Sequence, residues 1–241
     1  MVNRASKPST TLSVVIPALN EETNIRKVLE RIKKSLESSC IAYEIIVVDD
    51  GSTDKTAQIA DECGAEVISK KVNSGYGAAL KTGLFRARGQ YLAFIDADNT
   101  YPPEAIPLML KQAKHFSLVS GSRFTLSRNG MPINRKLGNL MFAAMIALLT
   151  RSGTTDVWTG LRLFDRKLLG IISGLPDDLT FTPIMTLKSI LNGFSYGETM
   201  IAYSEREGES KLNALREGWS FLKTLGLTLL SSSNEPAKSD R

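Results

Sequence analysis

Short apolar runs alternate with longer amphipathic segments along the first half of this chain. The runs predict strands over residues 12–16, 43–48, 65–69, 90–95 and 118–120. Between them, apolar residues recur at helical spacing, which predicts helices over residues 21–36, 54–63, 75–87 and 102–114. Strands that alternate with helices indicate an α/β fold with a mostly parallel sheet, and nearly continuous apolar strands indicate helices flanking both faces.

The second half of the chain has a less regular pattern. It predicts helices over residues 134–151, 181–192 and 211–230, and a strand over residues 195–204. Because no internal repeat or linker interrupts the pattern, we expect a single domain over residues 12–230. The polar ends, residues 1–11 and 231–241, are predicted to be flexible tails, and the first contains no apolar core of a signal peptide.

One apolar segment is a candidate for contact with a membrane. Residues 140–149 form the longest apolar run, but a helix needs about 20 such residues to cross a bilayer. Arg135, Lys136 and Arg151 flank the run. Two interpretations stay open: a buried core helix, or an amphipathic helix lying in a membrane interface with basic flanks at the headgroups. Residues 219–230 are a second candidate for such an interface helix.

Composition narrows the classes of function. The chain has 241 residues, 42% hydrophobic and 23% charged, which is typical of a globular protein. A net charge of +5 suits a phosphate-bearing ligand or an anionic membrane surface. The basic residues are scattered without an aromatic–basic platform, which argues against nucleic acid as a partner. Two cysteines and one histidine exclude a disulfide framework and a Cys- or His-based metal site, and they are consistent with a cytoplasmic protein.

Polar clusters follow three of the predicted strands, over residues 17–22, 49–52 and 96–98. Ligands of open α/β sheets bind beyond the carboxyl ends of the strands, so these clusters are the candidate site. Asp96 and Asp98 are two residues apart just past a strand, where both can face one cleft. Carboxylate oxygens in this arrangement suit Mg²⁺ or Mn²⁺ that keeps coordination positions for phosphate oxygens.

The common nucleotide-binding loops do not fit this sequence. Residues 75–77 begin as a GxGxxG motif, but Leu80 occupies the position of its third glycine, and the loop does not follow the first strand. The chain contains no GxxxxGK[ST] motif. Neither a dinucleotide-binding dehydrogenase nor a P-loop NTPase is therefore supported.

Four stretches of the sequence resemble family 2 glycosyltransferases, which have the nucleotide-sugar-binding fold called GT-A. They are VVIPALNEE at 14–22, VVDDGSTDKT at 47–56, NSGYGAALKTG at 73–83 and FIDADNTYPPE at 94–104. Three later stretches are similar to the dolichyl- or polyprenyl-phosphate mannosyltransferase branch: GSRF at 121–124, TDVWTGLRLF at 155–164 and REGESKL at 206–212.

The resemblance implies positions for the nucleotide-sugar donor and its metal. The donor's base and ribose are expected to contact Pro17, Glu21, Val48 and Asp50. Asp96, Ala97 and Asp98 match the metal and diphosphate site, with Asp96 and Asp98 as ligands. Thr100 stands where several relatives carry a glutamine ligand, so its hydroxyl is the candidate third ligand. The implied cofactor is Mg²⁺ or Mn²⁺.

The resemblance also implies cationic and acceptor positions. Arg123, Arg206 and Lys211 match cationic positions around the phosphates of the donor. Arg123 and Arg135 are the candidates for the acceptor phosphate. Asp156 matches an acidic position proposed to act near the acceptor, and together with Asp98 and Arg123 it completes the expected catalytic set.

The activity that the resemblance implies is inverting transfer of a hexose to a polyprenyl phosphate at the cytoplasmic face of a membrane. Mannose from GDP-mannose is favoured, while glucose or N-acetylglucosamine from a UDP-sugar stays open. Most of a phosphomonoester is already dianionic at neutral pH because its second pKa is about 6. We therefore expect Asp156 to orient the acceptor or the sugar rather than take a proton. The membrane and a small membrane-anchoring protein are the candidate macromolecular partners.

Two other functions are weighed against this one. A soluble glycosyltransferase with the same fold would use a saccharide or protein hydroxyl as acceptor, and the apolar segments with Arg135 favour the lipid phosphate instead. A non-catalytic nucleotide-sugar-binding subunit would not need a complete set of catalytic charges. The motifs of this chain retain that set, which is Asp96, Asp98, Arg123, Asp156 and Lys211.

Overall fold

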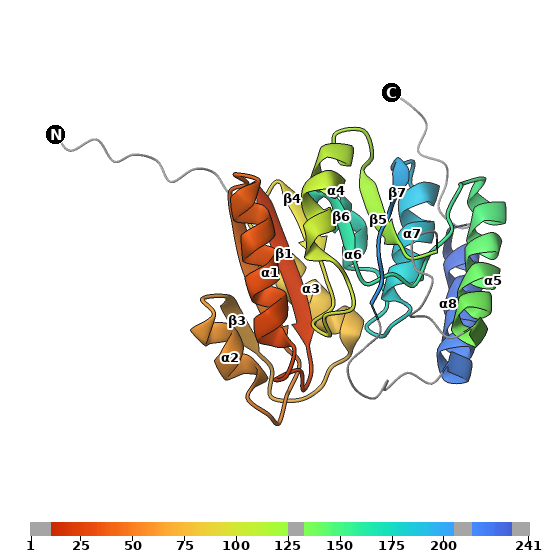
Figure 1. Ribbon diagram of the computed structural model, residues 1–241. Helices are drawn as coiled ribbons and strands as arrows, with labels where there is room; N and C mark the ends of the chain where they lie inside the picture. The colour runs from red at the N-terminus through yellow and green to blue at the C-terminus, as the bar shows by residue number, and fades with distance from the viewer. Residues whose placement is uncertain (1–10, 125–132, 205–213, 233–241) are drawn as a thin grey trace.

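The computed structural model describes residues 11–124, 133–204 and 214–232, which form helices around one sheet (Figure 1). The strands are β1 (Leu12–Ala18), β2 (Tyr43–Asp49), β3 (Glu66–Ser69), β4 (Tyr91–Phe94), β5 (Leu118–Ser122), β6 (Arg162–Asp165) and β7 (Tyr196–Met200). The α-helices are α1 (Ile25–Ser38), α2 (Thr56–Glu62), α3 (Tyr76–Arg86), α4 (Ile106–Gln112), α5 (Ile133–Thr150), α6 (Leu169–Ile172), α7 (Phe181–Leu191) and α8 (Ala214–Ser232). Two short 3-10 helices are η1 (Pro103–Ala105) and η2 (Arg166–Leu168).

The sheet is mostly parallel. Its seven strands are arranged in the order β3-β2-β1-β4-β6-β5-β7. β1 runs parallel to both β2 and β4, β2 runs parallel to β3, and β5 runs parallel to β7. The exception is β6, which lies antiparallel between β4 and β5. The predicted α/β class, with a mostly parallel sheet flanked by helices, is confirmed.

The sequence pattern does not predict β6. Its four residues, RLFD, carry a charge at each end and therefore form no apolar run. The strand is nevertheless central in the sheet, and the side chain of Arg162 is fully buried. The guanidinium of Arg162 donates to Thr186 Oγ1 at 2.7 Å and to the carbonyl of Val157 at 2.7 Å. These hydrogen bonds offset the cost of burying a charged group.

Several boundaries differ from the sequence prediction. The helix expected over residues 21–36 begins at Ile25, and the one over residues 102–114 is divided into η1 and α4. The helix expected over residues 211–230 is described from Ala214, because residues 205–213 lie outside the described part. The single domain over residues 12–230 stays a prediction, and most residues of the two tails lie outside that part as well.

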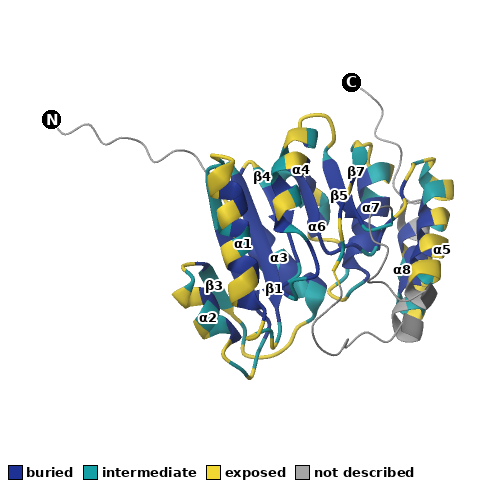
Figure 2. Ribbon diagram, in the orientation of Figure 1, coloured by how far each residue is buried: buried dark blue, intermediate teal, exposed yellow. Residues whose placement is uncertain are grey.

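Helices cover both faces of the sheet. The cluster of buried side chains on one face joins the strands to α1, α2 and α4. The cluster on the other face joins them to α3, α6 and α7, with α5 and α8 packed at its margin. Figure 2 shows that the strands between the helices are largely buried, as expected for a sheet covered on both sides.

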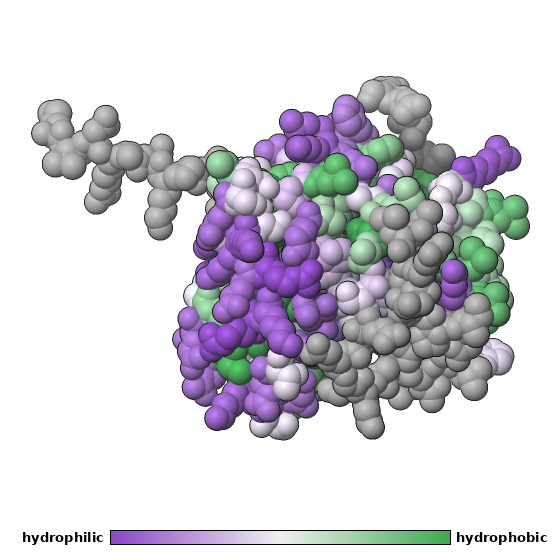
Figure 3. Space-filling view, in the orientation of Figure 1, coloured by the Kyte–Doolittle hydropathy of each residue, from purple (hydrophilic) through white to green (hydrophobic). Residues whose placement is uncertain are grey.

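The two ends of the molecule present different surfaces. Figure 3 shows hydrophilic side chains gathered over α1 and α2, whereas hydrophobic side chains appear over α5 at the opposite edge. Within the described residues, no helix combines the length and the apolar character that crossing a membrane requires.

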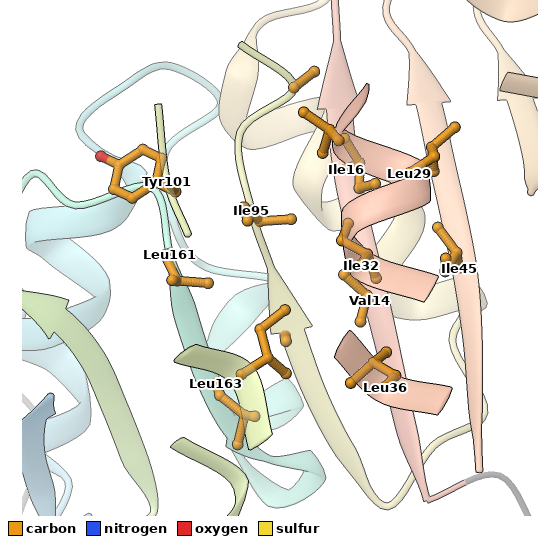
Figure 4. Close-up of a cluster of buried hydrophobic side chains, with 14 of the residues drawn as sticks. Val14, Ile16, Leu29, Ile32, Leu36, Ile45, Ile95, Tyr101, Leu161 and Leu163 are labelled. Atoms are coloured by element: carbon orange, nitrogen blue, oxygen red, sulfur yellow. The ribbon is translucent and has the colours of Figure 1, made fainter. Parts of the chain in front are cut away.

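β1 contributes side chains to both buried clusters. Val14 and Ile16 belong to the cluster on the α1 face, whereas Val15 belongs to the cluster on the α3 face. Figure 4 shows Val14 and Ile16 facing Leu29 and Ile32 of α1. Full burial of such an aliphatic side chain stabilises the fold by about 1.5–3 kcal/mol. This packing fixes β1, and with it the strand end from which the first polar loop emerges.

Candidate active site

Three polar loops lie at one edge of the sheet, after β1, β2 and β4. In the register of β1 and β2, Pro17 is opposite Val48 and Ala18 is opposite Asp49. β4 pairs with the other side of β1, and Asp96 follows it two residues later. Because these strands are parallel, their carboxyl ends meet at the same edge, where α/β sheets bind ligands.

Asp50 anchors the loop that precedes α3. Its buried carboxylate accepts hydrogen bonds from the amide and hydroxyl of Ser74, at 3.1 and 2.6 Å, and from the amide of Gly75 at 2.9 Å. Lys70 Nζ lies 3.4 Å from the same carboxylate. Burial alone raises the pKa of Asp50, but the bonds from Ser74 and Gly75 and the charge of Lys70 lower this pKa overall. The carboxylate is therefore ionised, and its contact with a nucleotide base stays a prediction.

Hydrogen bonds connect the loop after β1 to the loop after β2. The amide of Glu21 donates to Thr56 Oγ1 at 2.8 Å, and the amide of Asn20 donates to Ser52 Oγ at 2.9 Å. Val48 is fully buried in the core, and its contact with the donor stays a prediction. The structure thus brings the four residues expected to hold the base and ribose onto neighbouring strands and interlocked loops.

The loop after β4 holds Asp98 through a local turn. Asp98 Oδ1 accepts hydrogen bonds from the amide of Thr100 at 3.2 Å and from its hydroxyl at 2.7 Å. Thr100 is buried, as is Ala97. The hydroxyl expected to be a third metal ligand therefore orients Asp98 in this structure, and its role as a ligand stays a prediction.

Asp96 is enclosed by two residues that the sequence does not single out. Tyr76 Oη, at the start of α3, donates to Asp96 Oδ1 at 2.8 Å. Burial, followed by the charge of Asp96, raises the pKa of Tyr76 well above its ordinary value, so the phenol keeps its proton. On another side, a Cβ at Gly160 would lie 2.1 Å from Asp96 Oδ2. The carboxylate occupies the space left by the missing side chain of Gly160.

Arg123 and Asp156 form a buried ion pair. Arg123 Nε donates to Asp156 Oδ2 at 2.7 Å, and Nη2 donates to Oδ1 at 2.8 Å. Asp156 is fully buried and also accepts from Asn139 Nδ2 of α5 at 2.6 Å. Burial alone raises the pKa of Asp156. The charge and hydrogen bonds of Arg123, together with the hydrogen bond from Asn139, outweigh this effect and lower the pKa below its ordinary range. A carboxylate held this way orients a guanidinium and is a poor proton acceptor.

Tyr101 connects the ion pair to the loop that carries Asp96. Its hydroxyl accepts from Arg123 Nη1 at 3.1 Å and from the amide of Gly160 at 2.8 Å. The guanidinium of Arg123 also lies over the ring of Tyr203, 5.2 Å from its centroid. These contacts fix Arg123 from three sides. The residues expected near the donor metal and those expected near the acceptor therefore share one network.

Three expected site residues are not placed by the structure. Arg206 and Lys211 lie outside the described residues, and Arg135 is described only by its backbone in α5. Sequence reasoning in turn missed several residues of the network, which are Tyr76, Tyr101, Asn139 and Gly160. Three of the four lie inside the motif stretches, but a motif does not reveal which of its residues contact each other across the 17 to 59 positions that separate these pairs.

Comparison with known proteins decides the family. The model of "Glycosyl transferase family 2" matches residues 13–171. This chain belongs to that family. The glycosyltransferase is 33% identical over 220 residues to the dolichyl-phosphate hexose transferase of Haloferax volcanii, with 89% of this chain and 92% of that protein covered. It is 34% identical to the low-salt glycan biosynthesis hexosyltransferase Agl6 of the same organism, covering 87% of this chain but only 51% of Agl6.

Solved structures agree on the fold. Glucosyl-3-phosphoglycerate synthase from Mycobacterium tuberculosis, in complex with Mn²⁺, UDP and phosphoglyceric acid, superimposes with a TM-score of 0.70 at 25% identity. The superposition covers 95% of this chain and 80% of the other. The glycosyltransferase therefore has the GT-A fold, and the predicted family and fold are confirmed.

The residues at the sheet edge fit a divalent cation. Asp96 and Asp98 carry carboxylate oxygens on one short loop, and hard oxygens of this kind are typical of Mg²⁺ and Mn²⁺ sites that also bind phosphate. Within the described part of the chain, no group of three or more His, Cys, Asp or Glu side chains is placed to hold a metal. A cation held by these two carboxylates would complete its coordination with oxygens of the diphosphate and with water.

The contact between Gly160 and Asp96 predicts a large effect of a single methyl group. In Gly160→Ala the new Cβ must displace the Asp96 carboxylate, which we expect to lower the free energy of unfolding by about 1–3 kcal/mol. Displacing a catalytic group by about 1 Å typically costs about 100-fold in rate. Gly153→Ala is the matched control, because Gly153 also lies outside helices and strands and a Cβ there meets no atom within 4 Å apart from its chain neighbours. Urea unfolding and transfer rates that are equal for the two variants would contradict the contact.

Proposed function

We propose that this glycosyltransferase moves a hexose from a nucleotide-diphosphate sugar to a polyprenyl phosphate at a membrane surface. GDP-mannose is the favoured donor, and a UDP-sugar is the alternative. The observation that carries the proposal is the double role of α5. Asn139 on its buried side donates to Asp156, whereas Leu140 and Met141, the next two residues, are about half exposed at 50% and 53%. One helix thus joins the ion pair of the site to an apolar outer surface.

That apolar surface extends over two helices. Phe142 of α5 packs against Phe221 of α8 with ring centroids 4.7 Å apart, and the two helices lie side by side in Figures 1 and 2. Their exposed apolar side chains are Leu137, Leu140, Met141, Leu148 and Leu149 on α5 and Trp219, Leu222 and Leu227 on α8. Isolated exposed apolar residues are common, but a cluster of this kind marks a protein or membrane contact. We assign it to the interface of the cytoplasmic leaflet that holds the acceptor.

The reaction needs little help in deprotonating its acceptor. The phosphate of a polyprenyl phosphate is mostly dianionic at neutral pH, because its second pKa is about 6. One of its oxygens forms a bond to the anomeric carbon while the bond from that carbon to the diphosphate oxygen breaks, and the nucleoside diphosphate leaves. Attack from the face opposite the leaving group inverts the anomeric carbon. Arg123, oriented by its hydrogen bonds to Asp156, would neutralise phosphate charge during this exchange.

The donor is held at the other side of the network. Asp50 and the loops after β1 and β2 would bind the base and ribose, and Asp96 with Asp98 would hold the cation at the diphosphate. When bound, Mg²⁺ or Mn²⁺ stabilises the negative charge that develops on the leaving diphosphate. Arg206 and Lys211 are assigned to the same phosphates by family resemblance, and they lie outside the described residues.

A transfer assay tests the proposal and identifies the sugar. The purified protein is incubated with Mg²⁺ or Mn²⁺, a short polyprenyl phosphate and one labelled donor at a time: GDP-mannose, UDP-glucose or UDP-N-acetylglucosamine. We expect label to enter the organic phase with one donor, and only when the metal is present. If the protein binds a nucleotide sugar but no donor gives extractable label, even with a membrane-anchoring partner supplied, the lipid acceptor is wrong.

If the exposed face of α5 contacts a membrane, a negative charge introduced on that face should weaken membrane binding. Leu140→Glu should weaken binding to vesicles containing anionic phospholipid by about 10-fold or more, since burying a leucine contributes about 1.5–3 kcal/mol. Leu108→Glu on α4 is the matched control, because Leu108 is exposed to the same extent, 51% against 50%. The measurement is sedimentation with the vesicles at low and moderate salt. Equal binding by the two variants would contradict the assignment of the α5 and α8 surface.

A further inference from the structure

The loop before α3 is rigidly held from two sides. On one side, the carboxylate of Asp50 accepts hydrogen bonds from Ser74 and Gly75. On the other side, the segment that precedes α7 presses against the loop: a Cβ at Gly75 would lie 2.5 Å from the carbonyl oxygen of Asp177. Gly75 also has a φ of +102°, a conformation that other residues rarely adopt. The direction in which the next residue, Tyr76, leaves this loop is therefore fixed.

The first turn of α3 is fixed by the same segment. The amide of Ala78 donates to the carbonyl of Asp177 at 3.1 Å, and a Cβ at Gly77 would lie 2.2 Å from the carbonyl oxygen of Pro176. Lys81, one turn further along α3, forms an ion pair with Asp177 at 2.8 Å. The backbone on both sides of Tyr76 is thus clamped between Asp50 and the Pro176–Asp177 backbone.

From this fixed point, Tyr76 reaches the metal-site loop. Its hydroxyl donates to Asp96 Oδ1 at 2.8 Å, a normal length for an O–H···O hydrogen bond. Gly160 closes the space on another side of the same carboxylate, and the amide of Gly160 is held by Tyr101. A carboxylate confined in this way cannot rotate freely about its Cβ–Cγ bond, so the direction of both oxygens is set before any ligand arrives.

We propose that Tyr76 is a positioning residue that orients Asp96 for the divalent cation and couples its geometry to the loop held by Asp50. The inference rests on the proposed function, because it requires that Asp96 faces a metal–diphosphate. Groups that hydrogen-bond to metal ligands typically contribute about 10- to 100-fold to metal affinity or activity. Tyr76 would thereby link the end of the site that holds the nucleoside to the end that holds the cation.

The test measures binding, so it does not depend on catalysis. Affinities of GDP and UDP are determined by calorimetry with Mn²⁺ and with a chelator, for the full chain and for Tyr76→Phe. We expect Tyr76→Phe to weaken the Mn²⁺-dependent part of the affinity about 10- to 100-fold. The nucleotide affinity measured with the chelator should be unchanged, because the loop held by Asp50 stays in place. In an Asp96→Asn background, Tyr76→Phe should have little further effect, since contacting residues are not additive.

The control removes the same type of bond elsewhere. Tyr43 Oη donates to Glu37 Oε1 at 2.9 Å, at the opposite end of β2 from the site. Tyr43→Phe should therefore leave both affinities unchanged. If Tyr76→Phe keeps its Mn²⁺-dependent affinity, or loses metal-free affinity to the same extent, the positioning role is wrong. If the unaltered protein binds neither nucleotide with Mn²⁺, the proposed function itself fails, and this inference fails with it.

Discussion

Asp98→Ala is expected to lower the rate of sugar transfer about 1,000-fold while leaving the protein folded. Asp98 lies partly buried at the sheet edge, in the loop after β4. In the proposed reaction its carboxylate holds the cation that neutralises the leaving diphosphate, an effect of several kcal/mol. About 4 kcal/mol corresponds to a factor of about 1,000 in rate. The measurement is the initial rate of label transfer at saturating donor and Mn²⁺, with thermal unfolding of each variant in parallel.

Asp54 provides a matched control for this variant. Asp98 and Asp54 make the same local turn, because each accepts hydrogen bonds from the amide and hydroxyl of a threonine two residues later. Alanine therefore removes the same local turn at both positions, and at Asp54 it also removes a hydrogen bond from the amide of Glu22 at 3.2 Å. We expect comparable melting temperatures, with most of the transfer rate retained in Asp54→Ala. A comparable loss of rate in both variants would mean that Asp98 acts through its turn and not through a cation.

Asp156→Asn is expected to affect both stability and catalysis. The substitution keeps the shape of the side chain but leaves the guanidinium of Arg123 buried without its charge partner. Breaking a buried ion pair costs about 3–5 kcal/mol when one partner is removed, and we expect a loss of about 3 kcal/mol in the free energy of unfolding. Loss of the fixed orientation of Arg123 should lower the transfer rate about 100-fold. Urea unfolding and initial rates measure the two effects.

The pH dependence of Asp156→Asn distinguishes orientation from proton transfer. Because the pKa of Asp156 is lowered by folding, its ion pair stabilises the protein above the unfolded pKa of about 3.9, and this stabilisation is lost as pH falls through the folded pKa. The stability difference between the variant and the original protein should therefore be full at neutral pH and shrink in strong acid. Rescue of the transfer rate at high pH would instead identify Asp156 as a general base.

A surface pair serves as the control for Asp156. Arg26 and Glu62 form an ion pair of similar length, 2.8 Å, but both side chains are about half exposed, at 48% and 47%. Solvent screens such a pair, so Glu62→Gln should leave stability close to that of the original protein. Equal losses in Glu62→Gln and Asp156→Asn would contradict a special contribution from the buried pair.

Much of the fold was predictable because most strands and helices carry their own pattern. The apolar runs of β1 and β2 and the helical spacing of α1 are local signals, and the polar residues after each strand mark the sheet edge. β6 could not be predicted, because its burial depends on partners for Arg162 that lie up to 24 residues away in the chain. The antiparallel position of this strand is set by tertiary contacts and not by its four residues.

The candidate site was predictable residue by residue but not contact by contact. The motifs nominate Arg123 and Asp156 separately, 33 residues apart, and only the structure brings them together as an ion pair. Tyr76 lies inside a motif, yet its bond to Asp96 depends on the clamped loop before α3. The double role of α5 was also hidden, because its apolar run fits both a core helix and an interface helix.

Acceptor choice separates a lipid-phosphate transferase from a transferase of soluble substrates. The protein is supplied with Mn²⁺, the labelled donor that it uses, and three acceptors in parallel: a polyprenyl phosphate in vesicles, the corresponding polyprenol, and 3-phosphoglycerate. We predict that label enters the polyprenyl phosphate, with no detectable transfer to the alcohol or to the soluble phosphate. Transfer to 3-phosphoglycerate or to the alcohol at a rate equal to or above that of the polyprenyl phosphate would contradict the proposed acceptor.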